Sequence, residues 1–161
     1  MSEGFKIVKI KNGKRRFLPL LLIGDESETM IERYLQQDNL YVGMSNNVPI
    51  AVCVTLNIDK RTVEIKNLAV SPDFQRHGFG RLMLEHAECV NAGKSIILGT
   101  GETPSTLRFY EKCGYRYSHR VQNFFTDNYP DPIIEEGVTL RDMVYMKKIP
   151  LRRTKLYFRS L

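Results

Sequence analysis

Two glycines, Gly78 and Gly80, stand between an apolar run and a helical pattern in the stretch LAVSPDFQRHGFGRLMLEHAECV. The run before them, residues 62–70, has the alternation of a strand, and residues 78–91 place their apolar side chains on one face of a helix. Backbone N–H groups at the start of a helix attract anions, and glycine lets an anion come close to the main chain. The stretch therefore predicts a strand, an anion-binding loop and a helix in succession.

Hydrophobic periodicity predicts the other elements of the chain. Further strands are expected at 5–11, 39–45, 50–58, 93–100, 115–125 and 138–149, and further helices at 26–37 and 104–114. Ser27 is the expected N-cap of the helix 26–37, Gly114 is expected to end the helix 104–114, and residues 126–137 are expected to form a long loop. Strands that come first and then alternate with helices predict an α+β fold, in which helices cover a sheet.

The composition fits one domain in the cytoplasm. The chain has 161 residues, of which 42% are hydrophobic and 26% charged, as in ordinary globular domains. No apolar run reaches the roughly 20 residues of a membrane span, and the N-terminus has no apolar signal core, so we expect a cytoplasmic protein that does not bind membranes. The cysteines and histidines have no disulfide or metal-ligand spacing, so no metal is expected.

The excess positive charge lies at the end of the sequence. Residues 147–161 hold six basic side chains and no acidic one, which leaves 18 basic and 18 acidic side chains in residues 1–146. A nucleic-acid-binding protein usually needs a basic patch across its folded surface. We therefore expect a domain at residues 1–149, a short basic tail at 150–161 and no nucleic-acid partner, with a nucleic-acid-binding module that uses this tail as the alternative.

The glycine loop does not match two common phosphate-binding signatures. It lacks the Gly-Lys-Ser/Thr ending of a P-loop, and Met83 stands where a dinucleotide-binding loop has its third glycine. A glycine turn that only starts a helix is a further alternative.

The segment Gln75-Arg76-His77-Gly78-Phe79-Gly80 resembles the Gln/Arg-x-x-Gly-x-Gly motif of the GNAT superfamily of N-acetyltransferases. The similarity extends over residues 63–117 and includes FYEKCGY, which is similar to a later helix end of the family. The resemblance implies a GNAT-type acyl-CoA N-acyltransferase fold: a central mixed, mostly antiparallel sheet of six to seven strands, flanked by helices, with strands 4 and 5 splayed. It also implies acetyl-CoA as cosubstrate and leaves room for a homodimer that pairs through C-terminal strands.

The same resemblance implies which residues hold the coenzyme. Main-chain groups of the splayed strand would pair with the pantetheine arm, and the glycine loop would hold the pyrophosphate. Thr103 stands where the family often has an asparagine that contacts the cofactor or a water, and Ser105 offers a second hydroxyl. His77 would contribute its side chain or only its backbone. The complete set is Leu68, Ala69, Val70, Gln75, Arg76, His77, Gly78, Phe79, Gly80, Arg81, Thr103 and Ser105.

Glu64 is the expected general base. Many family members carry a glutamate here that accepts the amine proton, and a surface ion pair with Lys66 is the alternative role. Strand alternation predicts that Glu64, Lys66, Leu68 and Val70 share one face. The loop 126–137 supplies further candidates for the base or for attracting a cationic amine, namely Asp127, Glu135 and Glu136.

Tyr110 is the expected general acid, since it matches the family tyrosine placed near the coenzyme sulfur; packing within its helix is the alternative role. Together these features predict an N-acetyltransferase that moves the acetyl group of acetyl-CoA directly to an amine. The acidic loop 126–137 favours a small cationic amine as acceptor. A non-catalytic acyl-CoA-binding sensor and a protein amino-group acetyltransferase are the alternatives.

Overall fold

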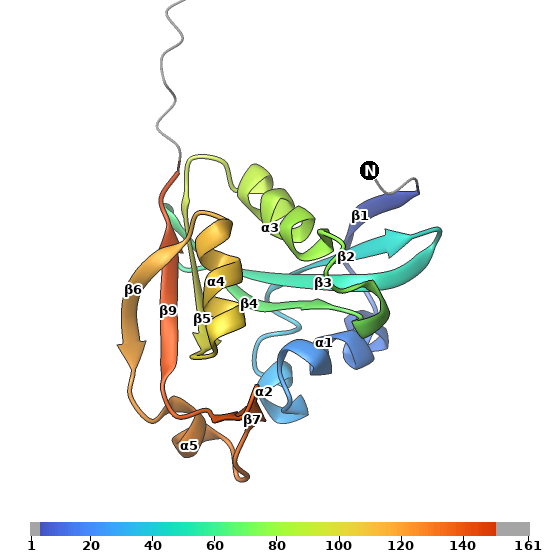
Figure 1. The fold of residues 1–161 in the computed structure, drawn as a ribbon. Helices are drawn as coiled ribbons and strands as arrows, with labels where there is room; N and C mark the ends of the chain where they lie inside the picture. Colours follow the sequence, from blue (N-terminus) through green and yellow to red (C-terminus); the bar gives the residue numbers. More distant parts are fainter. Residues whose placement is uncertain (1–3, 151–161) are drawn as a thin grey trace, which may run out of the picture.

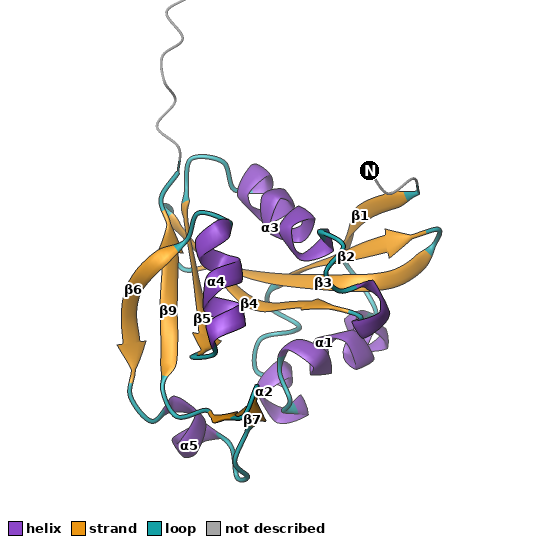
Figure 2. Ribbon diagram, in the orientation of Figure 1, coloured by secondary structure: helices purple, strands orange, loops and turns teal. Residues whose placement is uncertain are grey.

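The computed structural model describes residues 4–150 and consists of a seven-stranded sheet with helices on both faces and a separate two-stranded sheet, β7-β8 (Figure 1, Figure 2). The strands are β1 (Phe5–Ile10), β2 (Asn39–Ser45), β3 (Val48–Asn57), β4 (Thr62–Val70), β5 (Ser95–Gly101), β6 (Arg116–Val121), β7 (Ile134–Glu135), β8 (Val138–Thr139) and β9 (Met143–Lys148). The helices are α1 (Leu18–Gly24), α2 (Glu28–Glu32), α3 (Phe79–Val90), α4 (Pro104–Lys112) and α5 (Phe124–Asn128), with 3-10 turns η1 (Lys14–Phe17) and η2 (Pro72–Phe74).

Each face of the sheet has its own apolar core. Met83 and Leu84 of α3 and Tyr110 of α4 pack with strand residues in the first core. Leu21 of α1 and Ile31 of α2 pack in the second core, on the other face. A fully buried aliphatic side chain of this size contributes about 1.5–3 kcal/mol, so the apolar stripe of α3 that the sequence predicts is what fixes this helix on the sheet.

The sheet is mixed, as predicted, and opens in its middle. Its order is β1-β2-β3-β4-β5-β9-β6, and all neighbours are antiparallel except β4 and β5. The parallel pairing joins only residues 62–65 of β4 to residues 95–98 of β5, although both strands continue beyond it. The two strands therefore diverge after Ile65, which confirms the expected splay and leaves main-chain groups of residues 66–70 without a partner strand on that side.

A bulge in β4 corrects the expected facing of its side chains. The register against β3 shifts at Lys66, because Val54 pairs with Asn67 whereas Thr55 pairs with Ile65. An extra residue in one strand turns the following side chains to the opposite face. Leu68 therefore packs against the α3–α4 core together with Ile65. The prediction that Glu64, Lys66, Leu68 and Val70 share one face is wrong for this reason.

Three further elements differ from the periodicity. The helix expected at 26–37 is limited to α2, although Ser27 does cap it, since the N–H of Met30 donates to the Ser27 hydroxyl at 3.2 Å. The strand expected at 115–125 ends at Val121, and the strand expected at 138–149 is interrupted between β8 and β9. The chain leaves the sheet here because Phe125, Ile133 and Leu140 bury their side chains in a small third apolar cluster. Gly114, with φ of +96°, ends α4 as expected.

None of the helices in residues 4–150 has both the length and the apolar composition that crossing a membrane requires. The expected basic tail at 150–161 lies, apart from Pro150, outside the described residues.

A buried lysine ties the turn that follows α2 to the N-terminal segment. The ammonium group of Lys14 donates to the carbonyl oxygens of Leu35 at 3.0 Å, Gln36 at 3.3 Å and Asp38 at 2.5 Å. Lys14 is only 9% exposed. Because buried carbonyl groups need hydrogen-bond donors, one ammonium group that satisfies several of them fixes the conformation of residues 35–38.

We predict that Lys14→Met destabilises the fold strongly. The substitution leaves buried carbonyl groups without a donor, at about 1–3 kcal/mol for each group that water cannot reach. Urea denaturation should show a free energy of unfolding lower by about 2–4 kcal/mol. Lys11→Met is the matched control, since Lys11 is exposed, and it should change the stability by no more than about 0.5 kcal/mol. Equal stability of the two variants would contradict this stabilising role of the Lys14 ammonium group.

Candidate functional site

A groove of about 580 Å³ lies between the glycine loop, the diverging end of β4 and α4. Backbone and side chains of β4, the loop and α3 form one wall, and α4 forms the other. The groove is lined by Ile23, Leu68, Ala69, Val70, Phe74, Gln75, Arg76, Gly78, Phe79, Gly80, Arg81, Ser105, Thr106, Phe109, Tyr110 and Lys112. The structure thus brings together all the expected coenzyme-binding residues except His77 and Thr103.

The glycine loop has a backbone that only some residues adopt easily. Arg76 and Gly78 both have positive φ, +64° and +87°, and Gly78 is the left-handed N-cap of α3. The side chain of Gln75 donates to the carbonyl of Val70 at 2.9 Å and so holds the loop to the end of β4. A β-carbon on Gly80 would lie 3.2 Å from the Phe109 ring, so glycine here also permits α3 to approach α4. These features direct the free N–H groups at the start of α3 into the groove.

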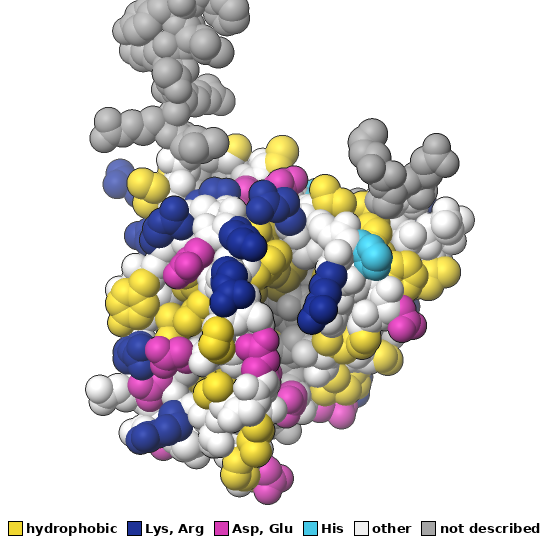
Figure 3. All heavy atoms as spheres, in the orientation of Figure 1, with side chains coloured by type: hydrophobic (Ala, Val, Ile, Leu, Met, Phe, Trp, Pro, Cys, Tyr) yellow, Lys and Arg dark blue, Asp and Glu magenta, His cyan; other side chains and the backbone are white. Residues whose placement is uncertain are grey.

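The groove is basic. Arg76, Arg81 and Lys112 line it and no acidic residue does. The Arg81 guanidinium donates to the carbonyl of Lys112 at 3.2 Å, which fixes its position between α3 and α4. Figure 3 shows several Lys and Arg side chains around the hollow on this face of the molecule. The groove therefore suits a ligand with several negative charges.

Two of the expected coenzyme-binding residues, His77 and Thr103, lie outside the groove, and a third, Ser105, is hydrogen-bonded to Glu136. His77 is exposed and does not line the groove. Thr103 is buried, and its hydroxyl donates to the Thr106 hydroxyl at 2.8 Å. The Ser105 hydroxyl donates to the carboxylate of Glu136, and the Ser105 N–H donates to the same carboxylate at 3.4 Å. The turn between β7 and β8 is thus attached to the start of α4.

Sequence reasoning missed several residues of the groove. Phe109 and Lys112 stand within the segment FYEKCGY, next to the expected acid, so their helical spacing from Tyr110 was the available signal. Ile23 comes from α1, far away in sequence, and no local pattern indicates it.

Tyr110 lies where this groove meets a second cavity. It lines both, and the two cavities also share Ile23, Leu68 and Thr106. The Tyr110 ring packs edge to face on the rings of Phe109 and Tyr115, with centroids 5.1 and 6.0 Å apart. Burial, followed by the neighbouring thiols Cys53 and Cys113, raises the pKa of Tyr110, so its hydroxyl stays protonated at neutral pH.

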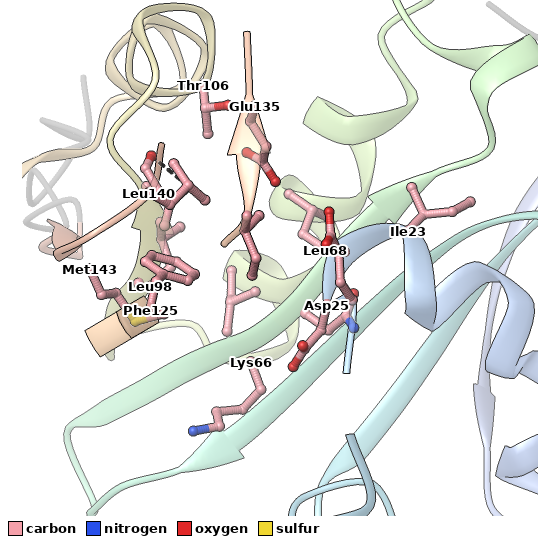
Figure 4. Close-up of a pocket in the computed structure, with 18 of the residues that line it drawn as sticks. Ile23, Asp25, Lys66, Leu68, Leu98, Thr106, Phe125, Glu135, Leu140 and Met143 are labelled. Atoms are coloured by element: carbon pink, nitrogen blue, oxygen red, sulfur yellow. Dashed lines mark hydrogen bonds between the residues drawn. The ribbon is translucent and has the colours of Figure 1, made fainter. Parts of the chain in front are cut away.

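The second cavity encloses about 240 Å³ between the end of α1, the bulge of β4, the far end of β5 and the segment 125–143. Three carboxylates, Asp25, Glu26 and Glu135, line it together with one ammonium group, that of Lys66. Figure 4 shows Asp25 and Glu135 on two walls of this cavity, while the Lys66 side chain points away from Glu135. The cavity is therefore acidic, in contrast to the groove.

The candidate bases differ in their surroundings. Glu64 does not line the acidic cavity; its carboxylate lies 3.5 Å from the Lys66 ammonium, as the ion-pair alternative predicted. Partial burial of its carboxyl, followed by the charges of Glu26 and Glu136, raises the pKa of Glu135. Hydrogen bonds from Ser105 lower the pKa of Glu136. Asp127 lies outside the cavity. Glu135 thus combines access to the cavity with the proton affinity of a base.

No three His, Cys, Asp or Glu side chains gather in residues 4–150 in an arrangement that could hold a metal ion.

Comparison with known proteins gives consistent matches. The family model of the acetyltransferase (GNAT) domain matches residues 36–117. Over 130 residues the chain is 35% identical to the Bacillus subtilis (strain 168) protein described as "Uncharacterized N-acetyltransferase YvbK", covering 78% of this chain and 83% of that protein.

Solved structures agree over nearly the whole chain. A GNAT family acetyltransferase from Elizabethkingia anophelis with acetyl-CoA bound superimposes with a TM-score of 0.85 at 34% identity, covering 91% of this chain and 99% of that one. An IAA acetyltransferase from Bacillus cereus ATCC 14579 superimposes with a TM-score of 0.81 at 32% identity, covering 89% of this chain and 99% of that one.

Proposed function

The chain belongs to the GNAT family of acetyl-CoA-dependent N-acetyltransferases, and we propose that it transfers the acetyl group directly to the amino group of a small cationic acceptor. One observation carries this proposal: a basic groove and an acidic cavity meet at Tyr110. The groove suits the polyanionic coenzyme, and the cavity suits a positively charged amine. With both bound, the donor and the acceptor lie on opposite sides of one junction.

The basic groove is our proposed coenzyme site. The N–H groups at the start of α3 and the side chains of Arg76 and Arg81 would hold the pyrophosphate. The free main-chain groups of residues 66–70 would pair with the pantetheine arm, because β4 has no partner strand there. A backbone N–H on this open edge would stabilise the negative oxygen that develops when the amine attacks the acetyl carbonyl.

Two side chains would move the protons. The amine nitrogen attacks the acetyl carbon and gives its proton to a carboxylate, for which we propose Glu135 in place of Glu64, because Glu135 shares the cavity with Tyr110 and has a raised pKa. The carbon–sulfur bond then breaks, and the leaving thiolate takes a proton from the hydroxyl of Tyr110. Burial keeps this hydroxyl protonated until it is needed.

The acceptor class can be tested with a panel of amines. Release of free coenzyme A thiol from acetyl-CoA should be fastest, by kcat/KM, with small aliphatic amines that carry additional positive charge. Neutral amines and peptides with a free amino group should be poorer acceptors, because a cavity of about 240 Å³ lined by three carboxylates favours a small cation. A clear preference for peptides would instead indicate a protein amino-group acetyltransferase.

Gly78→Ala should weaken acetyl-CoA binding. At φ of +87° a β-carbon costs about 1–2 kcal/mol, so the loop would change conformation and turn its N–H groups away, raising the dissociation constant about tenfold in isothermal titration. Gly93→Ala is the matched control: Gly93 has φ of +85°, and like Gly78 it has no atom within 4 Å of an added β-carbon, but it lies outside the groove. Unchanged affinity in folded Gly78→Ala, or equal loss in both variants, would refute the assignment of the loop.

The proton-transfer roles predict different pH profiles for three variants. In the wild type kcat/KM should fall as the pH drops through the pKa of Glu135, which lies above the usual value of a glutamate, because the protonated carboxyl cannot accept a proton. Glu135→Gln should remove this acid limb and slow transfer by about 10²-fold. Tyr110→Phe should slow transfer by about 10²-fold but keep the acid limb. If the limb persists in Glu135→Gln and disappears in Glu64→Gln, Glu64 is the base.

A further inference from the structure

Asp25, at the end of α1, is held in a fixed position at the edge of the acidic cavity. Its Oδ1 accepts hydrogen bonds from the hydroxyl of Tyr129 at 2.8 Å and from the N–H of Ser27 at 3.1 Å. Its Oδ2 accepts a longer hydrogen bond from the hydroxyl of Tyr34 at 3.5 Å. Three donors, one of them 104 residues away in sequence, thus orient one carboxylate, which is more preorganised than a surface acid.

The charge of Asp25 is not neutralised by a protein cation. The ion pairs among residues 4–150 do not include Asp25. Lys66, the one ammonium group that lines the same cavity, is paired with Glu64. Glu26 and Glu135 add further negative charge to the cavity lining. A cationic ligand would supply the missing counter-charge.

Asn67, on the same wall, helps to orient Asp25 through the Tyr34 hydroxyl. Its side chain is buried, with 3% of the residue exposed, and its Nδ2 donates to the Leu21 carbonyl at 2.9 Å and to the Tyr34 hydroxyl at 3.1 Å. Its Oδ1 has no hydrogen-bond partner within the described part of the chain. This oxygen packs against Gly24 and is closed to a ligand, so Asn67 acts through its Nδ2, which holds the Tyr34 hydroxyl that donates to Asp25.

The charged group that Asp25 binds differs from the amine that reacts. An attacking amine must be neutral at its nitrogen, whereas an ion pair with a carboxylate keeps an amine protonated and removes its nucleophilicity. Glu135, with its raised pKa, is suited to accept a proton, and the anchored carboxylate of Asp25 is suited to hold a permanent cation. The two carboxylates lie on two walls of the cavity (Figure 4).

We propose that Asp25 is a specificity-determining residue that binds a second ammonium group of the acceptor, so that the acceptor is a diamine or a longer polycation. One amino group reaches Tyr110 and the acetyl group, while the other pairs with Asp25. This inference rests on the proposed function. Tyr129, which follows α5 and donates to Asp25, makes the segment after β6 part of the same recognition site.

The test compares acceptors that differ in one charged group. The probes are 1,3-diaminopropane, 1,4-diaminobutane and 1,5-diaminopentane, each paired with the amino alcohol of the same length. Wild-type enzyme should acetylate at least one diamine with a kcat/KM about 10- to 100-fold above that of its amino alcohol, mainly through a lower KM. Asp25→Asn should bring this ratio close to one by raising the KM for the diamine. Asp131→Asn, which changes an exposed acid outside the cavity, should retain the wild-type ratio.

Tyr129→Phe provides a second variant in case Asp25→Asn does not fold. It removes one hydrogen bond to Asp25 and keeps the ring, so the ratio should fall part of the way. Equal use of diamine and amino alcohol by the wild type, or an unchanged ratio in both variants, overturns the inference and leaves the proposed function in place. If neither kind of probe is acetylated while peptides are, the proposed function fails and the inference with it.

Discussion

The short parallel pairing of β4 with β5 is the constraint on which the rest of this structure depends. Only residues 62–65 and 95–98 pair, and the bulge at Lys66 redirects β4 immediately afterwards. The separation of the two strands leaves main-chain groups of residues 66–70 without a partner strand on that side. The groove and the acidic cavity are both lined by residues of this part of β4 and meet at Leu68 and Tyr110. Without the divergence, the sheet would be continuous and the groove and the acidic cavity would not meet.

The groove and the acidic cavity carry opposite charges. The basic groove is built from α3, α4 and the glycine loop, and the acidic cavity from the end of α1 and the segment after β6. In a family that uses acetyl-CoA, this arrangement would let a strongly negative donor and the positive acceptor that we propose approach one junction without competing for one surface. Tyr110 lies at the junction: it is buried and still lines both the groove and the acidic cavity.

Local sequence patterns predicted the parts of the molecule that depend on local chemistry. The glycine loop, the apolar stripe of α3 and the cap at Ser27 follow from residues close together in the chain. The mixed sheet with its diverging strands was instead implied by the resemblance to the GNAT superfamily. The bulge at Lys66 could not be predicted, because it depends on how β3 and β4 pair, and strand alternation alone is the same with or without it. The facing assigned to Glu64 and Leu68 was wrong for that reason.

The sequence predicted only some of the residues of the acidic cavity. The loop 126–137 indicated Glu135, but Asp25 stands in a turn with no motif of its own, and its partner Tyr129 is 104 residues away. Such a group becomes recognisable only when the fold brings α1, α2 and the segment after β6 together. The third apolar cluster, with Phe125 and Leu140, packs the segment after β6 together around Tyr129, whereas the periodicity predicted Phe125 at the end of a strand.

A crystal structure with coenzyme A would test the central claim most directly. The account predicts the pyrophosphate within hydrogen-bonding distance of the N–H groups of residues 78–81, the pantetheine arm along residues 68–70, and the sulfur beside the Tyr110 hydroxyl. The acidic cavity would remain open behind the sulfur. A coenzyme bound outside the groove, or a sulfur atom that does not reach the junction of the two cavities, would contradict the account.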